Sequence, residues 1–307
     1  MTVFSEDIRD VVKKNVLKEH GKTIEDLSDY VQYLTKWIKS QPHFPEIPTE
    51  NMIEFILATT KFSTEIAKKK LDMYYTIRSI YPNYFNNLNP KLPYVRNAFN
   101  AGYVLPLPKI INEMYRVVII KPKEKSESIF NVTEQLYLVL DLYEIRMHED
   151  LMAGDIIVFD MTYLALGHVL KVSPMFVKAA VTILENLYST RIKEVHILNY
   201  PSVFDKLLAI AKLFIKPKLY DRLKLHSSFE SFLNYVPLEV LPKDYGGEEK
   251  SLDELEKMLK LKLTEYGDRF DKLDTLRVNE SLRPTELGIE SQEKFGVHGT
   301  FRQLNID

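Results

Sequence analysis

The segment EVHILNYPSVFDKLLAIAKLFI (residues 194–215) is the most informative stretch of this sequence for its architecture. Its first six residues form a short, mostly apolar run that is typical of a strand. From Ser202 onward the apolar residues recur at helical spacing, at positions 203, 204, 207, 208, 210, 211, 214 and 215. This apolar face is wider than a surface helix needs. It predicts either a buried core helix or a helix that also meets an apolar molecule other than the protein.

Two earlier runs have the same texture as residues 194–199. They are the β-branched run at 116–120 and DIIVFD at 155–160. Helical patterns lie between the runs, at 133–150 and at 173–188. Strands separated by helices of this length need crossover connections, and their continuous apolar character indicates cover on both faces. The sequence therefore predicts an α/β domain with a largely parallel sheet flanked by helices.

The first 90 residues read as helical instead. Apolar residues spaced by three and four from Leu27 to Ile38 form one stripe of a helix, and Thr49 and Ser63 are candidate N-caps of two more. We expect Lys68–Lys70 to lie mostly in water and the Asn- and Pro-rich run 82–93 to be a linker. The predicted division is a helical unit at 1–90, an α/β unit at 91–252, and a charged helix with an irregular tail at 253–307.

Composition limits the kind of protein this is. The chain has 307 residues, 45% of them hydrophobic, no cysteine, and a net charge of -2. A nucleic-acid-binding protein is usually more basic, and disulfides and thiolate metal sites are excluded. The charged N-terminus has no apolar signal region, and no window reaches the length of a membrane span. We therefore expect a cytoplasmic protein.

Motifs for catalysis are missing. The sequence has no phosphate-binding glycine loop, no G-x-S-x-G and no H-E-x-x-H, and its seven histidines are scattered without metal-ligand spacing. Asp155 and Asp160 flank an apolar strand, but carboxylates at strand ends are common. We expect binding rather than catalysis and no metal. An enzyme on an α/β sheet, such as a hydrolase or dehydrogenase, is the rival reading.

Basic residues surround the informative segment. Arg191 and Lys193 precede the strand, and Lys216, Lys218, Arg222 and Lys224 follow the helix. Taken singly, each is most often a solvated surface residue. If the strand entrance and the helix end approach in space, they form a basic patch that can hold a phosphate head group.

Several blocks, in this order, resemble the CRAL-TRIO lipid-transfer family over roughly residues 25–250. They are PTENMIEFILATTKFSTEIAKKKLDMYYTIR (48–78), GDIIVFDMTYLALGHVLKVSP (154–174), EVHILNYPSVFDKLL (194–208) and LPKDYGG (241–247). The end of the chain, FGVHGTFRQLNID (295–307), looks like the tails of insect members with tocopherol-transfer-like names. Leu57 stands where a typical member has an arginine, and Leu213 where many have a proline. The second departure predicts that the helix continues into Phe214.

The resemblance implies a three-helix N-terminal domain, then a mixed, largely parallel sheet that encloses one hydrophobic ligand under a mobile gate helix at about 202–215. It also implies a phosphoinositide-binding cleft beside the gate, whose four basic positions fall on Arg191, Lys193, Lys218 and Arg222. We expect ligand contacts from three groups of residues, each also credible as plain core. They are Leu140, Asp141 and Tyr143; Phe159, Met161 and Leu184; and Val203, Phe204, Leu207, Ile210 and Phe214. Asp141 or Tyr143 would supply a single polar contact.

The function that the resemblance implies is transfer of a retinoid, tocopherol, carotenoid or similar lipid, with the gate opening at anionic or phosphoinositide-containing membranes. No cofactor is expected beyond the bound hydrophobic ligand, no nucleic-acid partner, and peripheral contact with membranes. The alternative is a lipid-sensing regulator that docks a protein partner without net transport, for which the tail at 253–307 gives room.

Overall fold

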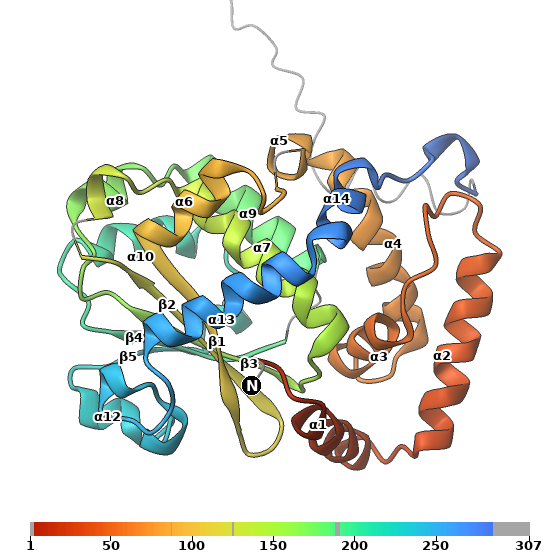
Figure 1. Ribbon diagram of the computed structural model, residues 1–307, viewed down its shortest axis with the longest axis horizontal. Coiled ribbons are helices and arrows are strands. Elements are labelled where there is room, and N and C mark those ends of the chain that lie inside the picture. The colour runs from red at the N-terminus through yellow and green to blue at the C-terminus, as the bar shows by residue number, and fades with distance from the viewer. Residues whose placement is uncertain (1–2, 87, 125, 188–190, 285–307) are drawn as a thin grey trace, which may run out of the picture.

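The computed structural model describes residues 3–86, 88–124, 126–187 and 191–284, and its centre is a five-stranded sheet (Figure 1). The strand order is β1-β2-β3-β4-β5, with β1 antiparallel to β2 and the other neighbours parallel. The strands are β1 Gly102–Ile111, β2 Tyr115–Pro122, β3 Gly154–Asp160, β4 Ile192–Leu198 and β5 Leu223–Leu225. The prediction of a mixed, largely parallel sheet is confirmed, and the three predicted strands are β2, β3 and β4.

Strands β1 and β5 are the two edges and were not predicted. β1 contains Pro106 and Pro108, which cannot donate to a strand ladder and are tolerated at an edge. The pairing with β2 shifts register between Pro106 and Ile110, so the proline-containing stretch is irregular. β5 is three residues long, too short for a periodic pattern.

Helices cover both faces of the sheet. In Figure 1, α6 to α10 lie above the strands and α12 below them. Their bounds are α6 Pro93–Ala101, α7 Val132–Glu149, α8 Leu166–Leu170, α9 Pro174–Leu187, α10 Phe204–Lys212, α11 Pro217–Tyr220 and α12 Phe229–Leu233. Single 3-10 turns occur at Ser126–Ser128, Leu238–Val240, Lys243–Tyr245 and Glu280–Leu282. The two predicted crossover helices are α7 and α9, and both are confirmed.

The N-terminal unit is helical, as predicted. Its helices are α1 Glu6–Glu19, α2 Ile24–Lys39, α3 Glu50–Thr59, α4 Thr64–Ile80 and α5 Pro82–Phe85. Thr49 and Ser63 cap α3 and α4, accepting hydrogen bonds from the backbone of Met52 and Ile66. The expected linker at 82–93 is wrong in part, because Pro82 begins the short helix α5 and Pro93 begins α6. Proline is favourable at the first position of a helix, because a backbone N–H there has no acceptor within the helix and its absence costs no hydrogen bond.

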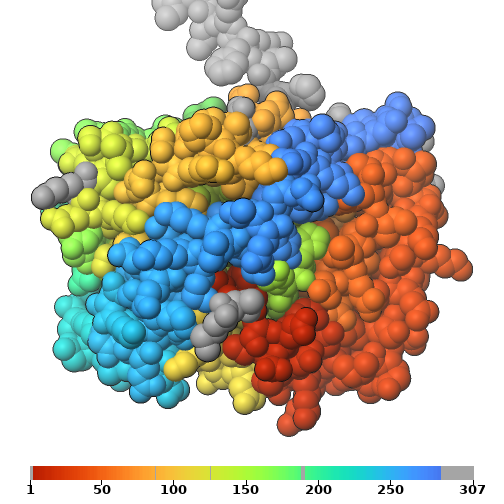
Figure 2. Space-filling model, in the orientation of Figure 1, coloured from red at the N-terminus to blue at the C-terminus, as the bar shows by residue number. Residues whose placement is uncertain are grey.

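Two C-terminal helices close the structure, α13 Leu252–Glu265 and α14 Gly267–Thr275. α13 crosses the front of the molecule and packs on β1 and α7 through its buried leucines (Figure 1). In Figure 2 the blue C-terminal residues lie against the orange N-terminal unit. Division of the chain at residues 90 and 252 stays a prediction. The tail at 295–307 lies outside the described residues.

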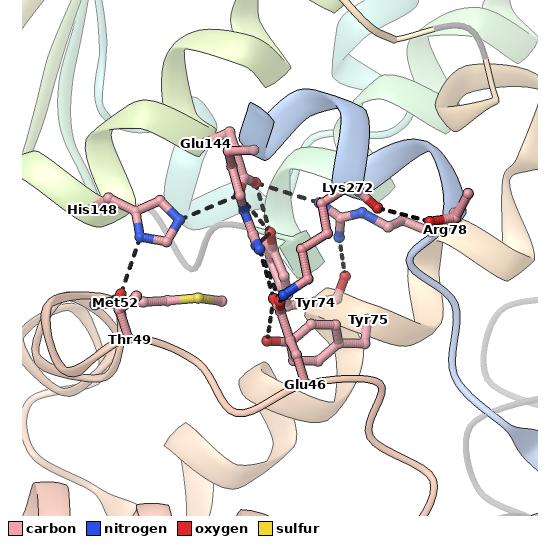
Figure 3. A network of polar contacts seen from close by, with 11 residues as sticks. Glu46, Thr49, Met52, Tyr74, Tyr75, Arg78, Glu144, His148 and Lys272 are labelled. Carbon is pink, nitrogen blue, oxygen red and sulfur yellow. Dashed lines mark hydrogen bonds and ion pairs between the residues drawn. The ribbon is translucent and has the colours of Figure 1, made fainter. Parts of the chain in front are cut away.

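The N-terminal unit, the sheet domain and α14 meet at the carboxylate of Glu144, on α7 (Figure 3). Its side chain is 1% exposed. The hydroxyl of Tyr74 on α4 donates to both its oxygens, at 2.7 and 2.8 Å, and Arg269 Nε on α14 donates at 2.9 Å. Arg78 on α4 pairs with it at 3.4 Å. Arg269 also pairs with Glu46, which precedes α3, at 2.8 Å. One buried acid thus binds three parts of the chain.

The electrostatics of this junction follow from its cations. Burial alone raises the pKa of Glu144, but His148, Arg269 and Arg78 outweigh burial and hold the pKa well below its usual range. The carboxylate is therefore charged in the folded protein at neutral pH and compensated from α4 and α14.

We expect Glu144→Gln to lower the free energy of unfolding at pH 7 by about 3–5 kcal/mol, because it removes the charge that compensates buried arginines. A carboxyl group with a lowered folded-state pKa stabilises above its unfolded pKa, about 4.3, and loses this contribution as pH falls. The difference between variant and wild type should therefore shrink below about pH 4. Urea unfolding at pH 7 and at a pH below about 4 measures this difference. Glu265→Gln, at an exposed carboxylate on α13 that pairs with Lys262, is the control. Equal losses in the two variants would contradict the central role of Glu144.

Candidate functional site

One face of the sheet carries Phe159, and the register identifies its neighbours. Phe159 lies beside Ile120 of β2 and Ile197 of β4. Residues side by side in register point to the same face of a sheet, as do alternate residues along a strand. Asp155, four positions before Phe159, therefore shares its face, and it binds Arg146 of α7 at 2.7 Å. The face of Phe159 is thus the one covered by α7, and Figure 1 places α9 and α10 on this same side.

Helix α10 covers this face only loosely. Of its nine residues only Phe204 is buried. Leu207 is half-buried against the edge of the core, and Ile210 is half-buried as well. The neighbouring predicted residues Val203 and Phe214 are also half-buried. By contrast, every residue of α3 from Met52 to Thr59 is buried. The wide apolar face of α10 therefore keeps accessible surface that the protein itself does not cover.

Helix α9, which contacts α10, behaves similarly. It is strongly apolar, yet only Ala179, Ile183 and Leu187 are buried. The predicted ligand residue Leu184 is half-buried, as is Phe159 on the sheet below, whereas Met161 at the end of β3 is buried. The structure thus brings β3, α9 and α10 together on one side of the sheet, with their predicted side chains partly accessible.

The three predicted residues of α7 lie differently. Leu140 is fully buried. Tyr143 faces the sheet and donates its hydroxyl to Asp155 at 2.5 Å, so this group already has a protein partner. Asp141 precedes Glu144 by one helical turn and shares its face, which is turned toward α4 and α14. The geometry gives no support to a polar ligand contact from either Tyr143 or Asp141.

The end of α10 differs from the expectation. The helix ends at Lys212 rather than continuing into Phe214. The chain still turns, since the backbone N–H groups of Phe214 and Ile215 both donate to the carbonyl of Ala211. Pro217 then begins α11 after Lys216.

The two segments that carry the basic residues beside α10 adjoin at one contact. The guanidinium of Arg222 donates to the backbone carbonyl of Ile192, which lies between Arg191 and Lys193. Lys218 is four positions before Arg222, in the turn of α11. The start of β4 and the segment after α10 therefore lie side by side, which is the arrangement that the predicted basic patch requires. Lys193 and Lys218 are exposed and Arg191 and Arg222 are half-buried.

Two further residues of this region, Lys70 and Glu185, were not predicted from the sequence. Lys70 of α4 was expected in water but is partly buried, and its ammonium donates to the backbone carbonyl of Glu185 on α9. The Glu185 carboxylate in turn pairs with Lys216 at 2.7 Å. A buried position within a run of three lysines leaves no signal in a single sequence, and neither does a contact between distant segments.

The strand-end carboxylates have structural roles. Asp155 is bound by Tyr143 and Arg146. Asp160 is bound by Lys121 at 2.7 Å, by Tyr245 at 2.9 Å and by Asn199 at 3.0 Å. Burial raises the pKa of Asp160, but the bonds from Asn199, Lys121 and Thr162 outweigh it and keep the pKa below its usual value.

Two histidines that are distant in sequence also meet, on the opposite face of the sheet. His196 Nδ1 lies 2.8 Å from His226 Nε2, and both rings pack on Phe232 of α12. Burial lowers the pKa of His196 to about 4, so this ring is uncharged at neutral pH, and burial also lowers the pKa of His226. The described residues contain no group of three or more His, Asp and Glu side chains that could hold a metal ion.

The class of fold is a helical unit followed by a mixed α/β domain. The apolar helix α10 lies over one face of the sheet, and beside it lies the basic margin, which consists of Arg191, Lys193, Lys218 and Arg222. Residues 101–247 match the family model described as the CRAL/TRIO domain, and residues 23–95 match the model described as the Pinta-like UBA domain. The chain belongs to the CRAL-TRIO family.

Among its relatives, a human protein named alpha-tocopherol transfer protein-like is 30% identical over 73% of this chain. The match spans 66% of that protein's own length, just under two thirds. Rat clavesin-1 is 23% identical over 78% of this chain and 68% of its own. A solved structure titled "Crystal structure of Sfh5" has 12% identity and a TM-score of 0.43 over 86% of this chain and 99% of its own. A likeness at that level carries no argument about function.

Asp141 gives a test of the buried face of α7. It is fully buried, and neither of its carboxyl oxygens has a hydrogen-bond partner among the described residues. Burial first, and then the nearby Glu144, raise its pKa well above the usual value. Burial therefore penalises the charged form of this carboxyl group in the folded protein relative to the unfolded chain.

We expect Asp141→Asn to raise the free energy of unfolding at pH 7 by about 1 kcal/mol or more, since one pKa unit corresponds to about 1.4 kcal/mol. A raised pKa destabilises above the unfolded value, about 3.9, and the penalty grows as pH rises. The gain should vanish near pH 4 and below. Urea titrations at the two pH values measure it, with exposed Asp10→Asn as the control. A gain that is the same at both pH values would exclude the protonation argument.

Proposed function

We propose that the protein binds one small hydrophobic molecule, such as a retinoid, tocopherol, carotenoid or similar lipid, between the sheet and α10, and transfers it to membranes. The observation that carries this proposal is the loosely covered apolar face formed by Phe159, Leu184 and α10. Membership of the CRAL-TRIO family and relatives named for tocopherol transfer support it. In this proposal α10 with its flanking residues, 202–215, is the gate, and Lys216 follows it directly.

The energy of such binding comes from apolar area. At about 25 cal/mol per Å², removing roughly 400 Å² of apolar ligand surface from water contributes on the order of 10 kcal/mol before binding entropy is subtracted. A ligand held so tightly does not leave at a useful rate on its own. Release therefore needs a surface that replaces the contacts that are lost.

Exposed apolar side chains beside the gate support a membrane as that surface. Leu170 on α8 is 76% exposed, Met175 at the start of α9 is 80% exposed, and Leu213 after α10 is 73% exposed. α8 contacts α10 directly, so these residues surround the gate. No helix among the described residues is long and apolar enough to cross a membrane. The proposed contact is peripheral, with a phosphoinositide or other anionic head group held by Arg191, Lys193, Lys218 and Arg222.

Organic extraction of the purified protein, followed by mass spectrometry, tests the carrier function. We expect one hydrophobic compound at close to one molecule per chain. Recovery of no stoichiometric compound, together with failure to accept any of the four ligand classes in a binding titration, would contradict the proposal.

The basic margin gives a second prediction. Replacing Arg191 and Lys218 together with alanine should slow ligand transfer to phosphoinositide-containing vesicles about 10- to 30-fold, because each basic residue near an anionic surface contributes about 1 kcal/mol. Transfer to phosphatidylcholine vesicles should not change. Lys36→Ala with Lys39→Ala, on exposed positions of α2, removes the same charge elsewhere and is the control. Unchanged transfer in the double variant excludes this margin as the membrane trigger.

A second candidate function is a lipid-sensing regulator that docks a protein partner without net transport. The match of residues 23–95 to a UBA-type domain model favours it, since domains of that kind are protein-interaction modules. Titration of the purified protein with ubiquitin, in the presence and absence of the extracted lipid, tests it. A lipid-dependent affinity with no transfer between vesicles would favour the regulator over the carrier.

A further inference from the structure

The carboxyl end of α9 is contacted by two lysines from different parts of the chain. Lys70 of α4 donates to the backbone carbonyl of Glu185, and Lys216, directly after the gate, pairs with the Glu185 carboxylate at 2.7 Å. The last carbonyls of a helix lack intrahelical partners and carry partial negative charge, so cations gather there. Glu185 therefore joins the N-terminal unit, α9 and the gate at one residue.

The two lysines are close enough to affect each other. Burial lowers the pKa of Lys70, and the Lys216 ammonium lowers it further, whereas Glu185 raises it. Lys216 is followed by Lys218 of α11 and by Arg222, which lies just after that helix. A carboxylate thus stands among several cations, which is the position that a phosphate group would also favour.

The two contacts at Glu185 differ in how easily they break. Lys70 is partly buried, and its bond holds α9 to α4. The side chain of Lys216 is 71% exposed and that of Glu185 29% exposed, and an exposed pair of this kind adds little stability. A phosphate group offers the Lys216 ammonium more charge and more acceptor oxygens than one carboxylate does.

We propose that Glu185 is a latch that holds Lys216, and with it the carboxyl end of the gate, against α9 until a phosphate group displaces the carboxylate. The gate then moves while α9 stays fixed to α4 through Lys70. This inference rests on the proposed gate function, and it assigns the trigger to one ion pair. The displacing group is a phosphate, from either a lipid head group or a soluble inositol phosphate.

The absence of cysteine makes the gate directly observable. Cysteines introduced at exposed Ala209 on α10 and exposed Leu261 on α13 accept one spin label each, and pulsed electron resonance reports the distance between them. In wild type we expect one short distance with phosphatidylcholine vesicles. A second, longer distance should appear with vesicles that also contain phosphatidylinositol bisphosphate.

In Glu185→Gln the latch is lost, so the longer distance should already be populated with phosphatidylcholine vesicles. The expected rise is about 2- to 5-fold, the factor that an exposed ion pair corresponds to. The charge-swapped variant Glu185→Lys with Lys216→Glu restores the pair and should return this population to the wild-type level. Glu265→Gln removes a pair of the same 2.7 Å length on α13 and should leave it unchanged.

The outcomes separate the latch from the gate. If Glu185→Gln and wild type have the same distances with phosphatidylcholine vesicles, or the swapped variant stays open, the latch is wrong while the gate function stands. If wild type shows no second distance with either kind of vesicle, both fail. Opening by soluble inositol hexakisphosphate without vesicles would support the latch and identify a soluble trigger, whereas opening by lipid vesicles alone would identify the head group.

Discussion

The Glu144 carboxylate is the contact on which the arrangement of the whole chain depends. It is bound by Tyr74 and Arg78 of α4 and by Arg269 of α14, and it belongs to α7, the helix that covers the Phe159 face of the sheet. The same helix α4 carries Lys70, which contacts the end of α9, so α4 links the buried junction to the helix that packs beside α10. The N-terminal helices therefore stabilise the sheet domain through the contacts that α4 makes with α7 and α9.

The ion pairs of this protein fall into two kinds by position. Beneath α7 they are buried, as in Arg146 with Asp155 and Arg116 with Asp150, whose side chains are at most 1% exposed. Breaking such a pair leaves a charge without compensation in a poorly polar environment, which is costly. After α10 the pair of Lys216 with Glu185 is largely exposed, and breaking it costs little free energy. Weak competition for this pair is therefore easier than for the buried pairs beneath α7.

Much of the fold could be predicted from the sequence, for reasons visible in particular elements. Strands β2, β3 and β4 each contain a buried run of mostly β-branched or apolar residues, whereas β1 contains two prolines and β5 has three residues. The site was predictable only as far as local pattern and resemblance reach. They predicted a gate helix and four basic residues, which stay predictions. They could not show that Asp141 lies on the side of α7 turned toward α4 and α14, because that depends on how distant segments pack. The pairing of Lys216 with Glu185 was equally out of reach.

The position of Arg269 bears on what a self-sufficient unit of this chain is. The recognised CRAL/TRIO segment ends at residue 247, but the guanidinium that neutralises Glu144 arrives from α14, beyond it. A chain truncated at residue 247 would retain strands β1 to β5 and α10. It would bury Glu144 without the compensating charge of Arg269. The self-sufficient folded unit therefore extends past the CRAL/TRIO segment and includes α14.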